Sequence, residues 1–293
     1  MYLYQLSIED WWKDLKDTFV LNFIADDRYM LLVKGLGNTF LVTLGATVLG
    51  IILGVLVALV RSTYDKNISD MRPGFGKGFL IVLNKIASAY LTVIRGTPML
   101  VQLMIAYFVI FVSIAQHKTI VAIIAFGINS GAYVAEIIRS GIMSIDPGQF
   151  EAGRSLGFNY AQTMLYIIIP QALKNVLPAL ANEFIVLIKE TSVSCYIGLH
   201  DLTKGGEIIR SRTYTAFMPL LAVAIIYLVI VMFFTKLVGI LERRLRNSER
   251  RSPHFGKRFK EVLLRGRDKS PRRRQHRYRQ GRGCSYHRTL WLR

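Results

Sequence analysis

The chain of 293 residues contains only two cysteines, Cys195 and Cys284, and five histidines. So few cysteines, so far apart, exclude a disulfide framework, and no His/Cys cluster has the spacing of a metal site. The motif GxxxxGK[ST], whose loop binds nucleotide phosphates, does not occur. We therefore expect no catalytic residue, no metal site and no cofactor in this chain, so any ATP would be bound by a partner.

The N-terminus lacks the basic region, short apolar core and small-residue cleavage site of a removable signal peptide. Residues 1–34 carry six acidic and four basic side chains, with Trp11, Trp12, Phe19 and Phe23 near helical spacing. We expect an extracytoplasmic amphipathic lead-in that is anchored at the membrane surface by its aromatic residues. A docking surface for an extracellular partner is the alternative.

Hydrophobic residues make up 52% of the chain and are concentrated in long runs. A helix rises about 1.5 Å per residue, so residues 35–60, which are uncharged, can cross a hydrocarbon core of roughly 30 Å. Residues 172–188 contain Lys174 and Glu183, so we expect that helix to lie inside a bundle. The fold class predicted is all-α, a polytopic membrane protein with five crossings. These are residues 35–60, 99–116, 119–134, 172–188 and 213–235.

Basic residues are concentrated beside alternate crossings. They follow the first crossing, lie between the third and the fourth, and follow the fifth, so the positive-inside rule places these segments in the cytoplasm. The other side then holds residues 1–34, the short link 115–118 and residues 200–212. An odd number of crossings puts the N-terminus outside and the C-terminus in the cytoplasm.

Residues 144–170 form the loop with the clearest local signals. Asp146 before a proline starts a helix, and we expect a short helix over 149–156, a break at Gly157, and a second helix from about Tyr160 to a boundary at Pro170. We interpret the small residues in the first helix as a surface that another protein approaches closely.

Residues 151–170, EAGRSLGFNYAQTMLYIIIP, resemble the cytoplasmic loop by which permease subunits of bacterial ABC importers contact their ATPase. That pattern has Glu-Ala-Ala, Gly six positions after the Glu, then Ile and Pro. Gly153 and Ile169 depart from it by replacing one small or aliphatic residue with another. The resemblance implies a coupling helix that sits in a cleft of the ATP-binding subunit; an ordinary amphipathic linker is the alternative. The implied coupling residues are Glu151, Ala152, Gly153, Gly157, Ile167 and Pro170.

Further segments are similar to permeases for polar amino acids, and together they cover roughly residues 30–246: VIRGTPMLVQLMIAYF at 93–108, NSGAYVAEIIRSGI at 129–142, and LERRL at 241–245. This resemblance implies a type I ABC importer permease over residues 35–246, in the bacterial inner membrane. It would translocate a polar amino acid that a solute-binding protein delivers, and a separate ATPase would drive it. The alternative is a secondary amino-acid transporter or channel that acts without an ATPase.

Polar residues on apolar helices are candidates for the substrate pathway. Because a zwitterion needs donors for its carboxylate and an acceptor for its ammonium group, we select Asn129, Tyr133, Glu136, Glu190, Thr191 and Ser192. Glu136 could instead pair with Arg139 or Lys174, and Glu190 with Lys189. Five helices enclose too little for a whole pathway, so we also expect a second permease subunit, which could be identical or merely similar.

The formal charge of +19 lies mostly at the C-terminus. From residue 242 onward there are 19 Lys and Arg against four Asp and Glu, which leaves about +4 for the rest. We expect residues 247–293 to be a basic, disordered tail that binds no nucleic acid, although RNA or anionic lipid is an alternative. With one choice among the permitted codons, residues 282–293 read one nucleotide out of frame as Glu-Val-Val-Val-Ile-Ile-Gly-Pro-Ser-Gly-Ser-Gly, so a frame-shifted end is our hypothesis.

Overall fold

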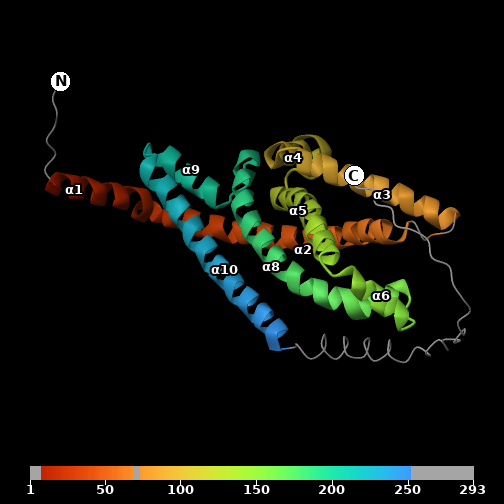
Figure 1. Ribbon diagram of the computed structural model, residues 1–293. Helices are drawn as coiled ribbons and strands as arrows, with labels where there is room; N and C mark the ends of the chain where they lie inside the picture. The colour runs from red at the N-terminus through yellow and green to blue at the C-terminus, as the bar shows by residue number, and fades with distance from the viewer. Residues whose placement is uncertain (1–7, 69–70, 72, 252–293) are drawn as a thin grey trace, which may run out of the picture. The chain divides into compact units, whose positions relative to one another are not determined.

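The computed structural model describes residues 8–68, 71 and 73–251, and every regular element in that part of the chain is a helix (Figure 1). The tail expected over 247–293 lies outside the described residues from position 252 onward. The α-helices are α1 (Ile8–Phe19), α2 (Tyr29–Asn67), α3 (Phe75–Gly96), α4 (Met99–Ile105), α5 (Lys118–Met143), α6 (Pro147–Ser155), α7 (Tyr160–Thr163), α8 (Ile169–Glu190), α9 (Leu202–Thr213) and α10 (Phe217–Arg251).

Short π and 3-10 turns join several of these helices. They are η1 (Val20–Ile24), η2 (Ala25–Asp27), η3 (Ala106–Ile110), η4 (Val112–Ile114), η5 (Met164–Ile168) and η6 (Thr191–Ile197). The π-helical turn η5 connects α7 to α8, so these pieces form one helical stretch from Tyr160 to Ile197. A membrane helix therefore continues directly out of the loop at residues 144–170.

Five helices in the described residues are long and apolar enough to cross a membrane, which confirms the expected number. They are Tyr29–Lys66, Phe75–Gly96, Lys118–Met143, Tyr160–Ile197 and Phe217–Leu245. The crossing expected at residues 99–116 is wrong, because Pro98 is the N-cap of α4 and the apolar helix that follows ends at Ile110. At about 1.5 Å per residue, that helix is too short to span roughly 30 Å alone. The second long helix is α3, which carries Lys77 and Lys85 that we had placed in a loop.

Helices α2 and α5 form the centre of the bundle and run in the same direction (Figure 1). A Cβ on Gly45 would meet Ile123, and one on Gly54 would meet Val134. Because the residue numbers of the contacts increase along both helices, the two helices are parallel. A Cβ on Gly127 would in turn meet Leu49 on α2. Small residues let helix backbones approach closely, which is how helices pack when lipid surrounds them.

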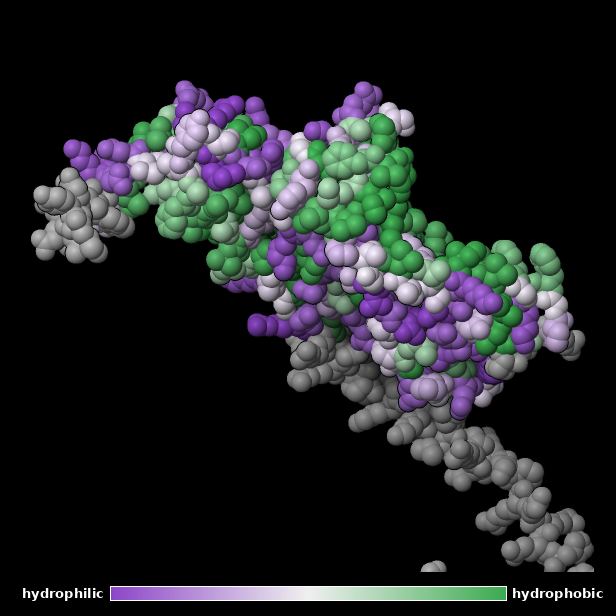
Figure 2. Space-filling view, turned by 90° about the horizontal axis from the view of Figure 1, so that it is seen from above, coloured by the Kyte–Doolittle hydropathy of each residue, from purple (hydrophilic) through white to green (hydrophobic). Residues whose placement is uncertain are grey.

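A buried apolar core joins α4, α5, α8 and η6. It includes Leu103, Val121, Phe126 and Leu187, all without exposed surface. Other apolar side chains face outward, as on α2, where Leu44, Val48, Ile52 and Leu56 are all more than half exposed. Figure 2 shows apolar side chains gathered over the middle of one face, with polar ones toward its edges. Exposed apolar surface of this kind fits a lipid environment.

The segment around α9 packs against the first half of α2. Asp201 is buried and caps α9, and its carboxylate accepts hydrogen bonds from the backbone N–H groups of Lys204 (2.9 Å) and Thr203 (3.3 Å). Burial raises the pKa of Asp201 to about 6, against an ordinary value of 3.8. By contrast, a hydrogen bond from Lys204 lowers the pKa of Glu207.

The residues before α2 are helical, and α2 itself begins at Tyr29, before the expected start at residue 35. Buried Asn22 ties this segment to the turn between α9 and α10. Its Oδ1 accepts hydrogen bonds from the hydroxyls of Thr213 (2.8 Å) and Thr215 (2.6 Å). The lead-in is therefore held to the rest of the bundle by buried polar contacts as well as by aromatic residues.

Candidate coupling loop and transport site

The loop at residues 144–170, here called the Glu151 loop, begins with a capped helix. Asp146 precedes α6 and its Oδ1 accepts a hydrogen bond from the N–H of Gly148 (2.8 Å), with Pro147 in the first turn. The helix ends before Gly157, whose φ of +82° lies in the left-handed region that glycine adopts without strain. Both the predicted start and the predicted break are confirmed.

The second helix of the loop starts with a reciprocal cap at Asn159. The Asn159 side chain accepts from the N–H of Gln162 (2.9 Å), and the Gln162 side chain accepts from the N–H of Asn159 (3.0 Å). We had predicted that this helix ends at Pro170, and that prediction is wrong. Pro170 lies in the first turn of α8, directly after the wider π-helical turn η5. Proline is tolerated in a first turn because the N–H that it lacks is not needed there.

Some of the coupling residues predicted in the Glu151 loop are buried, and others are exposed. Ala152 and Gly153 are buried, and a Cβ on Gly153 would meet the side chain of Thr163 in the second helix. Gly153 therefore lets the two helices of the loop approach each other, and because both residues are buried, neither presents the exposed surface that we had expected. Glu151 and Gly157 are exposed, as is Pro170, and Ile167 is half-buried.

Two apolar residues that sequence reasoning missed flank the turn of this loop. Leu156 is 58% exposed and Phe158 is 37% exposed, on either side of Gly157. Their signal in the sequence was an apolar residue on each side of a helix break in an otherwise polar loop. Together with Glu151 they offer a partner an apolar tip beside a carboxylate.

Aromatic contacts connect the Glu151 loop to the membrane helices. The ring of Phe150 on α6 stacks on that of Tyr160, with centroids 6.5 Å apart. The ammonium group of Lys66, at the end of α2, lies 4.8 Å from the centroid of the Phe150 ring. A cation over a ring contributes about 0.5–1 kcal/mol at an exposed site. The loop thus contacts α2 as well as leading into α8.

A row of polar side chains crosses the bundle at the break between α3 and α4. The Gln102 side chain donates to the carbonyl of Ile94 (2.7 Å) and to the hydroxyl of Thr97 (2.7 Å). Its Oε1 accepts from Nδ2 of buried Asn129 on α5 (3.0 Å). Beside it, the Ser130 hydroxyl donates to Oε1 of Glu183 on α8 (3.0 Å).

We call Gln102, Asn129, Ser130 and Glu183 the polar row. Gln102 was missed at the sequence level, and Glu183 was noted only as a charge inside a crossing. The usable signal for Glu183 was its carboxylate within an apolar helix, which marks a functional candidate by default. The row consists of two hydrogen-bonded pairs from adjacent positions on α5, one to α4 and one to α8.

Glu136 lies in a network of charges rather than alone. Its Oε1 is 2.6 Å from Nη2 of Arg139, and its Oε2 is 3.9 Å from Nη1 of Arg95. Arg139 also contacts Asp65 on α2 at 3.4 Å. The guanidinium of Arg95 lies 5.7 Å from the ring centroid of Tyr133, which is 37% exposed. Of the two pairings we considered for Glu136, the structure contains the one with Arg139.

The candidates at 190–192 lie where α8 ends and η6 begins. Thr191 is fully buried and its hydroxyl donates to the carbonyl of Ile188 (2.8 Å), so this hydroxyl is used within the chain. Glu190 and Ser192 are half-buried. Within the described residues, no group of three or more His, Cys, Asp or Glu side chains is placed to hold a metal ion.

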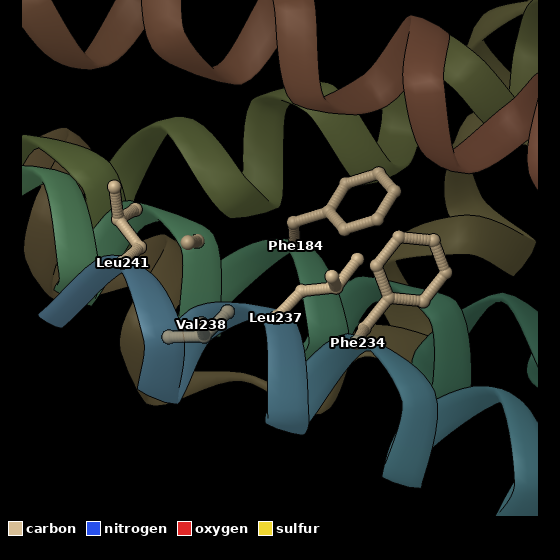
Figure 3. Close-up of a pocket in the computed structure, with 6 residues that line it drawn as sticks. Phe184, Phe234, Leu237, Val238 and Leu241 are labelled. Atoms are coloured by element: carbon tan, nitrogen blue, oxygen red, sulfur yellow. The ribbon is translucent and has the colours of Figure 1, made fainter. Parts of the chain in front are cut away.

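An apolar pocket lies between α8 and α10 (Figure 3). It has a volume of about 280 Å³ and is lined by Phe184 from α8 and by Phe234, Leu237 and Leu241 from α10, among others. Its lining offers hydrocarbon and aromatic groups rather than hydrogen bonds. It does not fit a zwitterionic ligand, and the polar row is the better candidate.

Residues 74–247 match the family described as binding-protein-dependent transport system inner membrane component. The chain belongs to this family. The permease is thus a multi-pass component of the inner membrane, and ATP is hydrolysed by a separate subunit. Membership implies an ATPase and a binding protein as partners. The alternative of a transporter that acts without an ATPase is therefore set aside.

Three relatives are similar to most of the permease. The putative glutamine transport system permease protein GlnP of Rickettsia typhi is 36% identical over 220 residues, which is 74% of this chain and 94% of the relative. The arginine transport system permease protein ArtQ of Bacillus subtilis has the same identity and coverage. The glutamine transport system permease protein GlnP of Escherichia coli K12 is 35% identical over 219 residues.

Solved structures agree with the all-helical fold. The permease is 42% identical to a chain from the crystal structure of an amino acid ABC transporter with histidines, with a TM-score of 0.66, over 76% of this chain and 98% of that one. An inward-facing structure of the methionine transporter MetNI has a TM-score of 0.61 at 21% identity, and supports the fold alone.

Proposed function

We propose that this chain is the permease subunit of an importer for a polar amino acid. The observation that carries the proposal is the 42% identity to an amino acid transporter chain that the alignment covers almost completely. Relatives that are named for glutamine and for arginine support the same substrate class. The particular amino acid is left to the binding protein that delivers it.

In this proposal the Glu151 loop contacts the ATPase. Glu151, Leu156 and Phe158 enter the cleft of the ATP-binding subunit, while Gly157 holds the turn between them. The capped helices and the Phe150–Tyr160 stack support this role, because a loop that keeps its shape can carry movement. The loop then faces the cytoplasm, which places the C-terminus there and the N-terminus outside.

The substrate pathway in this proposal runs along the polar row. Asn129, whose Nδ2 carries a second hydrogen besides the one donated to Gln102, supplies an amide donor for the carboxylate, and Glu183 supplies an acceptor for the ammonium group. Tyr133, Glu136 and residues 190–192 line the same pathway toward its two ends. A second permease subunit, identical or similar, closes the pathway within the lipid bilayer, and no nucleic acid takes part.

Uptake by the reconstituted complex tests this function. Proteoliposomes that contain the permease, its ATPase and its binding protein are given labelled glutamine, arginine or histidine, with ATP or with a non-hydrolysable analogue inside. We expect ATP-dependent accumulation of at least one amino acid. Maltose and molybdate serve as matched controls. Accumulation of a control solute, or of an amino acid without ATP hydrolysis, would contradict the proposal.

A further inference from the structure

The C-terminal region lies beyond the residues that match the family. The family match ends at residue 247, and the compact unit that holds the bundle ends at Leu245. From residue 252 onward the sequence has 14 Lys and Arg against two Asp and Glu. A change of composition at the point where family similarity stops indicates a different origin for the residues that follow.

The genetic code restricts what the same nucleotides encode one position later. Trp291 has the single codon TGG, and every leucine codon begins with C or T, so the shifted codon is GGC or GGT and always encodes glycine. Tyr286 followed by His287 gives ATC or ACC, which encode Ile or Thr. His287 followed by Arg288 again gives only Ile or Thr.

Two further pairs are restricted in the same way. Cys284 followed by Ser285 allows only Val or Ala in the shifted frame, and Gln280 followed by Gly281 allows only Lys or Arg. The remaining positions permit the rest of one continuous motif, which reads Lys-Gly-Glu-Val-Val-Val-Ile-Ile-Gly-Pro-Ser-Gly-Ser-Gly. An apolar strand followed by GxxxxG is the order that occurs at a phosphate-binding P-loop.

We propose that the DNA encoding residues 280–293 also encodes, one nucleotide out of register, the start of the P-loop of the ATP-binding subunit. The partner that the permease requires is then encoded by DNA that overlaps the coding sequence of residues 280–293. The identity of the partner rests on the proposed function, whereas the reading frame does not. In this proposal the charges of Arg282, Arg288 and Arg293 follow from the second reading frame and need no ligand.

Sequencing of the locus tests the frame directly. In the shifted frame, the glycine codon that begins inside the Arg293 codon is expected to be followed by a lysine codon and then by a serine or threonine codon, which completes GxxxxGK[ST]. An open reading frame should continue beyond it. Any other residue at the lysine position, or a stop codon in the shifted frame before it, overturns the proposal, whatever the permease transports.

Synonymous codons provide a second test in cells. Where Arg288 and Arg293 are both encoded by CGG, changing both to CGC leaves this chain unaltered but converts both P-loop glycines to alanine. Changing both to AGG is the matched control, because it is silent in both frames. We expect the CGC allele to lose uptake of the amino acid and an intact copy of the ATPase gene, supplied on a plasmid, to restore it. Equal uptake by the two alleles overturns the proposal.

Truncation separates the tail from the DNA that encodes it. A permease that ends at Arg251, expressed with the ATPase gene supplied separately, is expected to transport at the level of the full chain. Loss of transport in that strain would show that the tail itself has a function and would overturn the proposal. Absence of uptake from the parent locus would instead contradict the proposed function, and the sequencing result would still decide the frame.

Discussion

The Glu151 loop and the polar row differ in where their contacts come from. In the loop, Asp146 and Asn159 cap helices with partners that lie two and three residues away in the sequence. In the row, Ser130 contacts Glu183, and Asn129 contacts Gln102, across separations of 53 and 27 residues. A surface loop can hold its shape by local contacts, whereas buried polar groups must find partners on neighbouring helices. Substitutions in the two regions should therefore have different effects on transport and on stability.

The largest effect is expected from Gly157→Val. A β-branched residue is strongly disfavoured at a φ of +82°, and strain of this kind costs about 1–3 kcal/mol. No atom lies near the position, so the bundle itself should fold normally. We expect uptake to fall about tenfold or more, as 1.4 kcal/mol corresponds to a factor of 10, while thermal unfolding of the purified permease changes little.

Gly157→Asn is the control for this prediction, since asparagine tolerates the left-handed region. It should retain most of the uptake. If the valine variant kept substrate-stimulated ATP hydrolysis at the parent level, the coupling role of this turn would be wrong.

The second prediction concerns Glu183→Gln in the polar row. The amide can still accept from Ser130, but it no longer offers a negative charge to an ammonium group. We expect uptake to fall several-fold, by an increase in the KM of transport. Ser130→Ala removes the same hydrogen bond and keeps the charge, so it should cost only about 1 kcal/mol of stability. A larger uptake defect in the serine variant would show that the polar row stabilises the bundle and does not bind the substrate.

A smaller effect is expected from Glu136→Gln, because this carboxylate already pairs with Arg139. Such partly exposed pairs contribute about 0–1 kcal/mol. If Glu136 also lines the pathway, uptake should fall while the melting temperature is nearly constant. Asp65→Asn, which removes the other partner of Arg139, is the matched control. Equal uptake defects in the two variants would show that the ion pairs of Arg139 stabilise the fold and that Glu136 does not line the pathway.

The smallest effect on transport is expected for Asp201, where the change is in the pH dependence of stability. The pKa of buried Asp201 is about 6 in the folded chain, above the ordinary value of 3.8. The folded state therefore binds this proton more tightly, and stability from this group falls as pH rises between these values. The full shift corresponds to at most about 3 kcal/mol. Asp201→Asn can still cap α9, so it should flatten the melting temperature between pH 4 and pH 7, and an unchanged pH profile would rule out this role for Asp201.

The features that could be predicted were those with a local cause. The cap at Asp146 and the break at Gly157 follow from residue types that adopt those conformations. The predicted crossing at residues 99–116 was wrong at its C-terminal end, since an uncharged run does not register the end of the helix at Ile110. Pro170 was misplaced because the π-helical turn before it has no sequence signature. The burial of Gly153 against Thr163 depends on how two helices pack, which residue types alone do not specify.

The continuous helix from Tyr160 to Ile197 has a mechanical consequence. At about 1.5 Å per residue, its 38 residues make a rod of roughly 57 Å, which includes the π-helical turn η5, Pro178 and the 3-10 turn η6. One end lies in the Glu151 loop, and the other carries residues 190–192. A tilt of about 5° at one end therefore displaces the other by about 5 Å. A small rotation at the loop is enough to rearrange side chains on the far side of the membrane.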